Sequence, residues 1–210
     1  MQYLSKDIWF PDVTEATQEG LLAIGGDLSV HRLLYAYRNG IFPWFGDGEP
    51  ILWWSPDPRF VLFPEKLKVS KSMKQVLRNC DYEVTVNKAF EEVIIQCSKA
   101  KREGQSGTWI TGDMIDAYVE LHEMGYAKSV EVWKEGILVA GLYGVDLDNG
   151  VFCGESMFTN ESNASKAGFI TFIKNSNYSL IDCQVYTNHL ERLGAEEIPR
   201  DMFLKYLTNK

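Results

Sequence analysis

The sequence has no apolar run long enough to cross a membrane. Its longest apolar stretches are far shorter than the ~20 residues that a bilayer span needs. The opening stretch, MQYLSKDIWFPD, also lacks the basic region followed by an apolar one that marks a secretory signal. We therefore expect a cytoplasmic protein with no membrane partner.

Metal and disulfide motifs are missing as well. The three histidines show no H-x-x-x-H spacing, and no C-x-x-C spacing occurs among the four cysteines, Cys80, Cys97, Cys153 and Cys183. This argues against a zinc site, a redox motif or a disulfide framework. We interpret each cysteine as a small buried apolar residue.

Positive charge is scarce overall, because the 210 residues carry a formal net charge of −8. Net charge is a weak guide when charges are unevenly placed. One segment carries five basic residues with no acidic residue among them, namely Lys66, Lys68, Lys71, Lys74 and Arg78. A local basic face is therefore compatible with an acidic protein.

The pattern of the sequence changes near residue 62. Before it, paired glycines and several prolines break the sequence into turns around one short helix that Ser29 can cap. After it, helical and alternating patterns follow one another regularly. We predict a small irregular N-terminal domain over residues 1–62 and a second domain over residues 63–210.

The second part predicts an α+β fold. Ser70 can cap a helix, and three strands at 129–133, 137–146 and 151–158 are joined by the tight turns KEG and DNG. A helix over 163–174, a strand over 180–185 and two short helices follow. This order of elements is that of the acyltransferase fold that includes the GNAT acetyltransferases, with a mixed, mainly antiparallel sheet flanked by helices.

Two polar side chains stand in the apolar strand SLIDCQV. Alternation would place Asp182 and Gln184 on one face of that strand. Burying them unpaired costs several kcal/mol, so they need partners in the protein or in a ligand. Glu155 in VFCGESMF raises the same choice between a structural and a substrate role, whereas His189 fits a helix-capping or surface role better than that of a general base.

Some large aromatic and basic side chains can have either a structural role or a role in binding a ligand. Trp44 and Trp109 stand in turns flanked by glycine or proline, where a ring can cover a cleft, although most tryptophans are core residues. Lys71, Lys74 and Arg78 fall on one face of the predicted helix. Such a face is either simply solvated or a contact for nucleic acid.

Many segments of the chain, in order, closely resemble the leucyl/phenylalanyl-tRNA protein transferases: GLLAIGGDLS, RLLYAYRNGIFPWF, ILWWSPDPRFVLFP, GTWIT, LHEMGYAKSVEVW, GLYGV, FCGESMF, NASK and IDCQV followed by HLERLGAEEIPR. The resemblance implies transfer of leucine or phenylalanine, with methionine as a further candidate, from aminoacyl-tRNA to the α-amino group of proteins beginning with Arg or Lys. It implies that these proteins are marked for degradation by the N-end rule. It implies no cofactor and no metal.

The resemblance also implies roles for individual residues. Asp182 and Gln184 would be catalytic, with Gln184 orienting the amine or relaying its proton while Asp182 holds Gln184 or attracts the ammonium. The terminal adenosine and its ester would lie against Trp44 and Trp109. The pocket for the incoming side chain would be formed by Phe152, Glu155 and Phe172.

The basic face would contact the acceptor stem of the tRNA through Lys71, Lys74 and Arg78. Here the chain departs from the family pattern, because Gln75 and Asn79 stand where further basic residues are common. We therefore expect weaker or more salt-sensitive tRNA binding.

Two other functions compete with this one. A GNAT acetyltransferase would need a backbone cradle for the pyrophosphate of acetyl-CoA, but FTNESNASKA has no glycine before Gly168. A non-catalytic module that binds basic N-termini would explain Glu155 and Asp182 but not the tryptophans or the basic helix. We expect a monomer, because no coiled-coil pattern or repeated apolar stripe is present.

Overall fold

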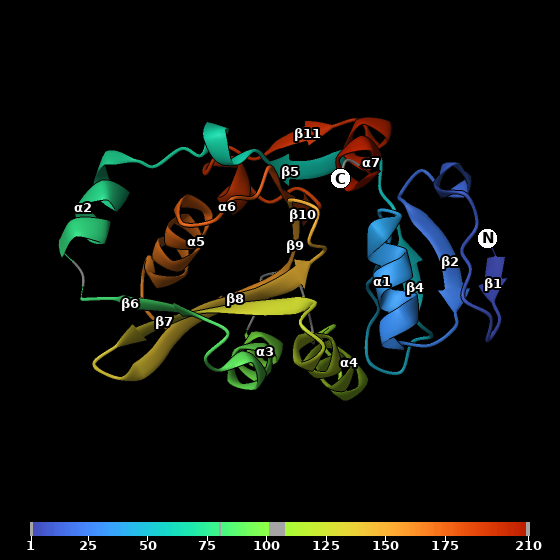
Figure 1. Cartoon of the computed structure of the whole chain (residues 1–210), viewed down its shortest axis with the longest axis horizontal. Coiled ribbons are helices and arrows are strands. Elements are labelled where there is room, and N and C mark those ends of the chain that lie inside the picture. Colours follow the sequence, from blue (N-terminus) through green and yellow to red (C-terminus); the bar gives the residue numbers. More distant parts are fainter. Residues whose placement is uncertain (1, 80, 101–107, 209–210) are drawn as a thin grey trace.

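Two β-sheets lie along the long axis of the molecule, of which the structure, a computed structural model, describes residues 2–79, 81–100 and 108–208 (Figure 1). The smaller sheet has, in spatial order, β1 (Gln2–Leu4), β2 (Leu21–Gly25), β4 (Leu52–Trp54) and β3 (Phe42–Pro43). The larger sheet has, in spatial order, β11 (Glu196–Ile198), β5 (Arg59–Leu62), β10 (Leu180–Gln184), β9 (Val151–Thr159), β8 (Ile137–Asp146), β7 (Ala127–Lys134) and β6 (Glu83–Val86).

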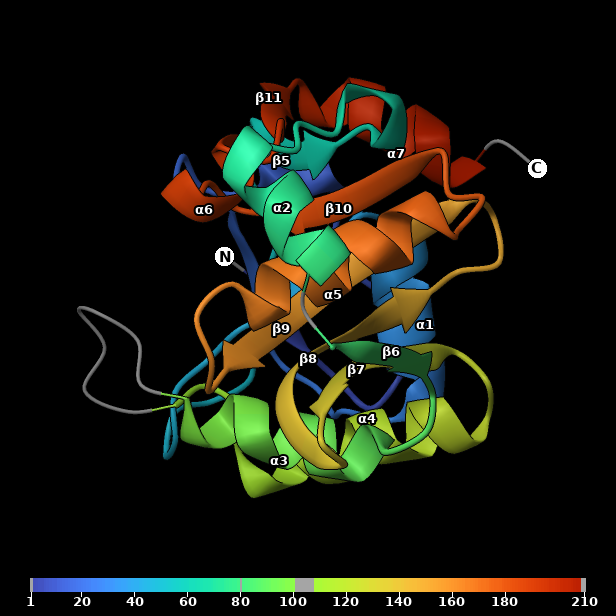
Figure 2. The same cartoon turned by 90° about the vertical axis from the view of Figure 1, so that its left-hand side faces the viewer.

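Helices cover both faces of the large sheet. The helices of the described residues are α1 (Val30–Arg38), α2 (Lys71–Asn79), α3 (Phe90–Lys99), α4 (Gly112–Glu123), α5 (Ala164–Lys174), α6 (Asn188–Glu191) and α7 (Arg200–Thr208), with short 3₁₀ turns η1 (Val13–Glu15) and η2 (Pro64–Lys66). Figure 2 shows the sheet between α5 on one side and α3 and α4 on the other. Because β8 is covered on both faces, nine consecutive residues, 138–146, are buried, which explains its unbroken apolar run.

Local signals in the sequence fix the ends of these elements. Ser70 Oγ accepts a hydrogen bond from the backbone N–H of Met73 at 3.2 Å at the start of α2. Glu135 and Gly136 have φ values of +50° and +77°, as a tight turn between antiparallel strands requires, and they join β7 to β8. The three predicted strands 129–133, 137–146 and 151–158 are therefore confirmed as the meander β7–β8–β9.

The predicted α+β class, with a mixed and mainly antiparallel sheet flanked by helices, is confirmed. Strands β9 and β10 run parallel, while β10 with β5 and β8 with its two neighbours run antiparallel. The sequence did not predict the four-stranded N-terminal sheet, nor that β5 joins the large one. The division into domains at residue 62 stays a prediction.

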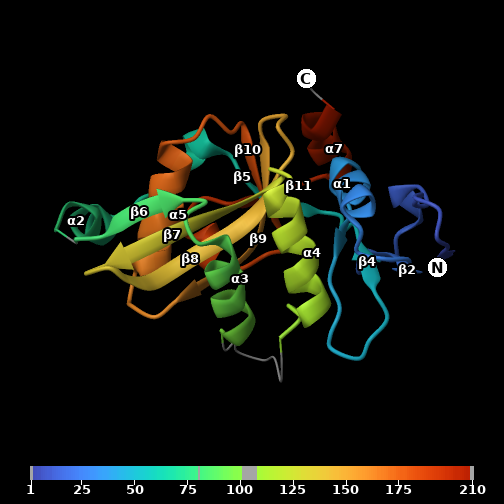
Figure 3. The same cartoon turned by 60° about the horizontal axis from the view of Figure 1, so that its bottom comes forward.

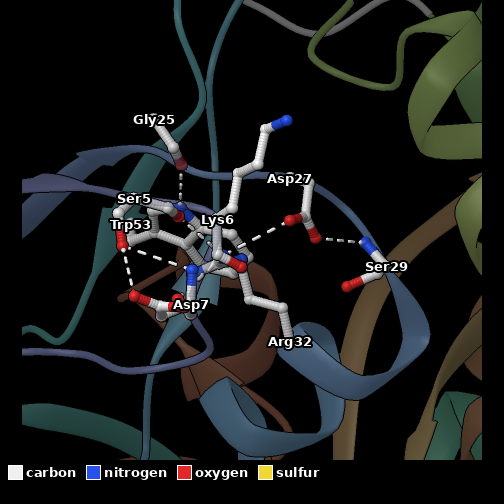
Figure 4. Close-up of polar contacts among 8 residues, drawn as sticks. All are labelled: Ser5, Lys6, Asp7, Gly25, Asp27, Ser29, Arg32 and Trp53. Carbon is white, nitrogen blue, oxygen red and sulfur yellow. Dashed lines mark hydrogen bonds and ion pairs between the residues drawn. The ribbon is translucent and has the colours of Figure 1, made fainter.

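A buried arginine fastens the N-terminal segment to α1, as Figure 4 shows. The side chain of Arg32 is fully buried, and its Nη2 lies within 2.9–3.3 Å of the backbone oxygens of Ser5, Lys6 and Asp7 and of Asp27 Oδ2. This cluster holds three successive carbonyl groups in place, so the segment after β1 packs against the rest of the chain.

Figure 3 shows α2 at the end opposite the strands of the small sheet. Within residues 2–79, 81–100 and 108–208, no helix combines the length and the apolar character needed to cross a membrane.

Candidate active site

A cavity of about 460 Å³ is walled by β8, β9, β10 and α5, with further residues from β3, from the segment before α4 and from α6. Six residues that the sequence picked out line this cavity: Trp44, Trp109, Phe152, Glu155, Asp182 and Gln184. They come from parts of the chain far apart in sequence. The fold therefore gathers most of the predicted site residues around one space.

Strand β10 is irregular where its polar residues stand. Asp182 pairs with Val61 but Gln184 pairs with the adjacent Phe60, so Cys183 is the extra residue of a β-bulge. Gln184 has a φ of +64°, in the left-handed region that non-glycine residues rarely adopt. The simple alternation predicted for this strand therefore ends at Asp182, and a bulge sets the position of Gln184.

Asp182 is paired with a buried arginine. Its Oδ1 accepts a hydrogen bond from Arg59 Nε at 2.8 Å, and its Oδ2 accepts one from Arg59 Nη2 at 2.7 Å. The two side chains are 0% and 1% exposed. Two parallel charge-assisted bonds are the strong arrangement for such a pair, and they meet the requirement that a buried carboxylate have a partner.

Gln184 and Glu155 are joined by a hydrogen bond. The side-chain Nε2 of Gln184 donates to Glu155 Oε1 at 2.7 Å, and Tyr118 donates to Glu155 Oε2 at 3.2 Å. The hydroxyl of Tyr118 is in turn bonded to that of Tyr37. A buried hydrogen-bonded chain therefore runs from α1 through α4 and β9 to β10.

The position of Glu155 changes its acidity. Burial raises the pKa of Glu155 to about 7, although hydrogen bonds from Tyr37, Tyr118 and Gln184 favour the ionised form. Burial also raises the pKa of Tyr37 and Tyr118 well above the usual value, so both hydroxyls keep their protons. Near neutral pH the site thus holds a carboxyl group poised between its two protonation states.

The side-chain oxygen of Gln184 is available to a ligand. Its Nε2 is engaged by Glu155, which turns the Oε1 of the planar amide the other way. No hydrogen bond to this Oε1 is found among the residues that the structure describes. Gln184 can therefore accept a hydrogen bond from a group that enters the cavity.

Two tryptophans line both this cavity and a neighbouring space. Trp44 is 38% exposed, and both Trp44 and Trp109 also line a neighbouring space of about 950 Å³. The ring of Trp54 lies 5.7 Å from that of Trp44, and Trp54 Nε1 donates to the Trp44 carbonyl oxygen at 2.7 Å. The backbone and one face of Trp44 are thereby held, while part of the ring stays accessible.

The apolar part of the cavity is formed by Leu142, Phe152, Met157, Phe169 and Ile181. Phe172 does not line it. Its ring packs against that of Phe152 at 4.9 Å between centroids and borders a separate space on the other side. On α5 it is Phe169, one turn before Phe172, that reaches the cavity.

The basic residues lie away from the cavity. Lys71, Lys74 and Arg78 are exposed on α2, and none of them lines the cavity. Figure 3 shows α2 at one end of the molecule, next to α5. Any role of these residues must concern a ligand that extends well beyond the cavity.

Sequence reasoning missed Arg59 and Tyr37, and it expected His189 to cap a helix or to lie at the surface. Thr187, not His189, caps α6, with its Oγ1 accepting from Leu190 N at 3.3 Å. His189 lines the cavity instead, and burial lowers its pKa, which favours the neutral ring. The only signal for Arg59 was the requirement that Asp182 have a partner.

The cysteines behave as expected where they can be seen. Cys97 and Cys153 are buried, Cys183 is partly buried, and Cys80 lies outside the described residues. Over the described ranges, no group of three or more His, Cys, Asp and Glu side chains is arranged to hold a metal ion.

Comparison with known proteins gives consistent matches. Residues 61–208 match the family model described as leucyl/phenylalanyl-tRNA protein transferase, and residues 26–57 match that of its N-terminal domain. A leucyl/phenylalanyl-tRNA protein transferase of Flavobacterium johnsoniae is 59% identical over 100% of both chains. One of Syntrophus aciditrophicus is 57% identical over 95% of this chain and 84% of that one.

Solved structures are more distant. One described as a GCN5-related N-acetyltransferase from Kribbella flavida is 14% identical, with a TM-score of 0.40 over 77% of this chain and 58% of that one.

Proposed function

The chain belongs to the leucyl/phenylalanyl-tRNA protein transferase family, and from that premise we propose that it transfers leucine or phenylalanine from aminoacyl-tRNA to the N-terminal α-amino group of proteins that begin with Arg or Lys. It is thus an aminoacyltransferase. The observation that carries the proposal is the bond between Gln184 and Glu155 inside an apolar cavity that two tryptophans border.

The donor binds by stacking and apolar contact. The terminal adenosine of the tRNA lies against Trp44 and Trp109, where stacking of a base is worth about 1–3 kcal/mol. The amino-acid side chain enters the space between Phe152, Phe169 and Ile181. Such a pocket accepts leucine, phenylalanine and also methionine, because it discriminates between apolar side chains by only about 1–3 kcal/mol per methylene.

The reaction needs little beyond positioning and proton transfer, because the aminoacyl ester is already activated. The α-amine of the acceptor attacks the ester carbonyl carbon, a C–N bond forms, and the ester C–O bond breaks. The nitrogen loses a proton and the ribose oxygen gains one. Gln184 Oε1 accepts a hydrogen bond from the attacking amine and directs its lone pair at the carbonyl carbon.

An amide is too weak a base to hold the proton. Glu155, with a pKa of about 7, is suited to exchange it at neutral pH, and it is already bonded to Gln184. Asp182 is fully paired with Arg59 and serves to hold Gln184 in place rather than to attract the ammonium. The pairing with Arg59 and the bond to the Gln184 backbone support the first of the two roles that the sequence left open for Asp182, that of holding Gln184.

The rest of the tRNA lies along α2. Lys71, Lys74 and Arg78 contact phosphates of the acceptor stem, which requires charge rather than base recognition. Gln75 and Asn79 add no charge there, so binding depends on few cations.

The proposed substrates imply where the protein acts. Because the donor is charged tRNA, it acts in the cytoplasm, where its products are marked for degradation by the N-end rule. We propose that it acts as a monomer, because the sequence has no coiled-coil pattern or repeated apolar stripe.

A transfer assay tests the proposal. The purified protein is incubated with radiolabelled leucyl-tRNA and a model protein beginning with Arg, and with labelled acetyl-CoA in a parallel reaction. We expect label in the acceptor only with the tRNA donor, and none when the acceptor begins with Ser. Label from acetyl-CoA, or binding of the acceptor with no transfer, would contradict the proposal.

A further inference from the structure

We propose that Arg59 is a positioning residue for the transfer reaction, acting on Gln184 through Asp182. The inference rests on the proposed function and adds to it a residue that does not line the cavity.

Arg59 is held on every side. Besides its two bonds to Asp182, its Nη1 donates to the carbonyl oxygen of Gly40 at 3.2 Å. Its guanidinium carbon lies 4.8 Å from the centre of the Phe42 ring and 4.7 Å from that of Phe203. One cation thus joins β5, the turn after α1, β3, α7 and the strand that carries the catalytic residues.

Asp182 connects Arg59 to the backbone of Gln184. The Oδ1 atom that accepts from Arg59 Nε also accepts from the backbone N–H of Gln184 at 2.9 Å. That bond closes a local turn at the point where Gln184 adopts its left-handed conformation. The direction of Asp182 Oδ1 therefore sets the backbone from which the Gln184 side chain extends.

The side chain of Gln184 depends on that backbone. Its Nε2 must lie 2.7 Å from Glu155 Oε1 for the amide oxygen to face the opposite way. A small rotation of Asp182 would shift the backbone of Gln184 and, with it, the side-chain amide. A displacement of 1 Å at a reacting group can slow a reaction about 100-fold. Only a guanidinium can hold both oxygens of Asp182 at once, because an ammonium has no such fork.

Another buried arginine provides a matched control. Arg32 is as buried as Arg59 and also donates to backbone carbonyl oxygens, at Ser5, Lys6 and Asp7. None of these residues lines the cavity. Arg32→Lys therefore measures what the loss of a buried guanidinium costs without disturbing Gln184.

The first experiment compares Arg59→Lys with Arg32→Lys in transfer from leucyl-tRNA to a peptide beginning with Arg. We expect kcat to fall about 100-fold in Arg59→Lys with the KM for leucyl-tRNA unchanged, because the binding groups stay in place. In Arg32→Lys we expect a lower Tm and an unchanged kcat. Equal kcat values in wild type and Arg59→Lys, or a loss of kcat that follows Tm alike in both variants, would overturn the inference.

A double-mutant cycle tests the path through Asp182. If Arg59 acts only by holding Asp182, Arg59→Lys adds no further loss of kcat in an Asp182→Asn background. Additive losses would show that Arg59 acts by another route. Should Arg59→Lys fail to fold, the double variant Arg59→Gln/Asp182→Asn leaves no unpaired buried charge, and wild-type kcat in that variant would overturn the inference equally.

A last measurement separates this inference from the proposed function. Hydrogen exchange of the Gln184 backbone amide needs no substrate, and we expect it to be faster in Arg59→Lys than in wild type, and unchanged in Arg32→Lys. Wild-type protein that transfers nothing would refute the proposed function alone. Unchanged exchange at Gln184 in Arg59→Lys would refute the positioning role alone.

Discussion

The side-chain amide of Gln184 donates to Glu155 Oε1 at 2.7 Å, so a neutral group that faces the cavity is oriented by a group that titrates. An amide can present either its oxygen or its nitrogen to a substrate, and here the carboxylate decides which.

Gln184→Ala removes the acceptor for the attacking amine. We expect kcat to fall by about 100-fold or more, the usual scale for a group that assists proton transfer, with little change in the KM for leucyl-tRNA. The check is steady-state transfer kinetics. Tyr186→Phe is a suitable control, because the Tyr186 hydroxyl bonds Asn188 and Glu191 outside the cavity. A Gln184→Ala enzyme of normal kcat would contradict the proposed mechanism.

Glu155 should make the reaction sensitive to pH near 7. Its ionised form accepts from both Gln184 and Tyr118, whereas the protonated form can donate to Gln184 Oε1 and allow the amide to turn round. We expect kcat/KM to rise as pH rises through about 7. In Glu155→Gln only the titration of the acceptor amine, at roughly 7.7–8.0, should remain. Identical pH profiles in the two proteins would exclude this role.

The same shift predicts how stability depends on pH. The folded protein binds a proton on Glu155 up to pH about 7, whereas in the unfolded chain this carboxyl group has its ordinary pKa of about 4.5 and releases the proton there. Since the folded state binds more protons in that interval, the contribution of Glu155 to the free energy of unfolding falls as pH rises from about 4.5 to 7. Denaturant titrations of wild type and Glu155→Gln at pH 5 and pH 8 measure the difference. A wild-type advantage that grows toward pH 8 would be the opposite of what we expect.

Tyr118→Phe should move this titration upward. The hydrogen bond from Tyr118 favours the ionised form of Glu155, so its loss raises the pKa of that carboxyl group further. The rise of kcat/KM should then occur at higher pH than in wild type, while activity at high pH is largely retained. A pH profile that stays in place would separate Tyr118 from the titration of Glu155.

The sequence singled out Asp182 and Gln184 because burying polar groups in an apolar strand is costly and therefore informative, and the family resemblance then implied their catalytic role. It did not reveal Arg59, which lies 123 positions from Asp182 and meets it only through the pairing of β5 with β10. It also missed the bulge at Cys183, because no residue type there demands one. Contacts between distant segments are set by topology, which local patterns do not contain.

The choice between Phe172 and Phe169 shows the same limit within one helix. Both rings are buried, and the apolar pattern of α5 contains both. Only the rotation of α5 against the sheet decides that Phe169 reaches the cavity while Phe172 packs behind Phe152. The apolar run of α5 is nearly continuous, so the sequence does not fix that rotation.

Trp109→Ala should weaken donor binding. Loss of one stacking surface is worth about 1–3 kcal/mol, so we expect the KM for leucyl-tRNA to rise roughly 5- to 150-fold. Trp133→Ala is a matched control, because Trp133 lies in β7 and donates to Thr85 outside the cavity. Equal KM values for these two variants would mean that Trp109 is an ordinary packing residue.

The basic face of α2 should make tRNA binding depend on salt concentration. Neutralising Lys71, Lys74 or Arg78 one at a time removes one phosphate contact and one released counterion, so the slope of log K against log salt should become shallower by roughly 0.7–0.9 per residue. Binding of uncharged tRNA, measured at several salt concentrations, tests this without any chemistry. Lys205→Ala, on α7 and exposed like the others, controls for the loss of a surface charge. If the three α2 variants and Lys205→Ala all share the wild-type slope, α2 is only a solvated face. If Gln75→Lys, which adds a charge, steepens the slope by roughly the same 0.7–0.9, the phosphate backbone lies along this helix.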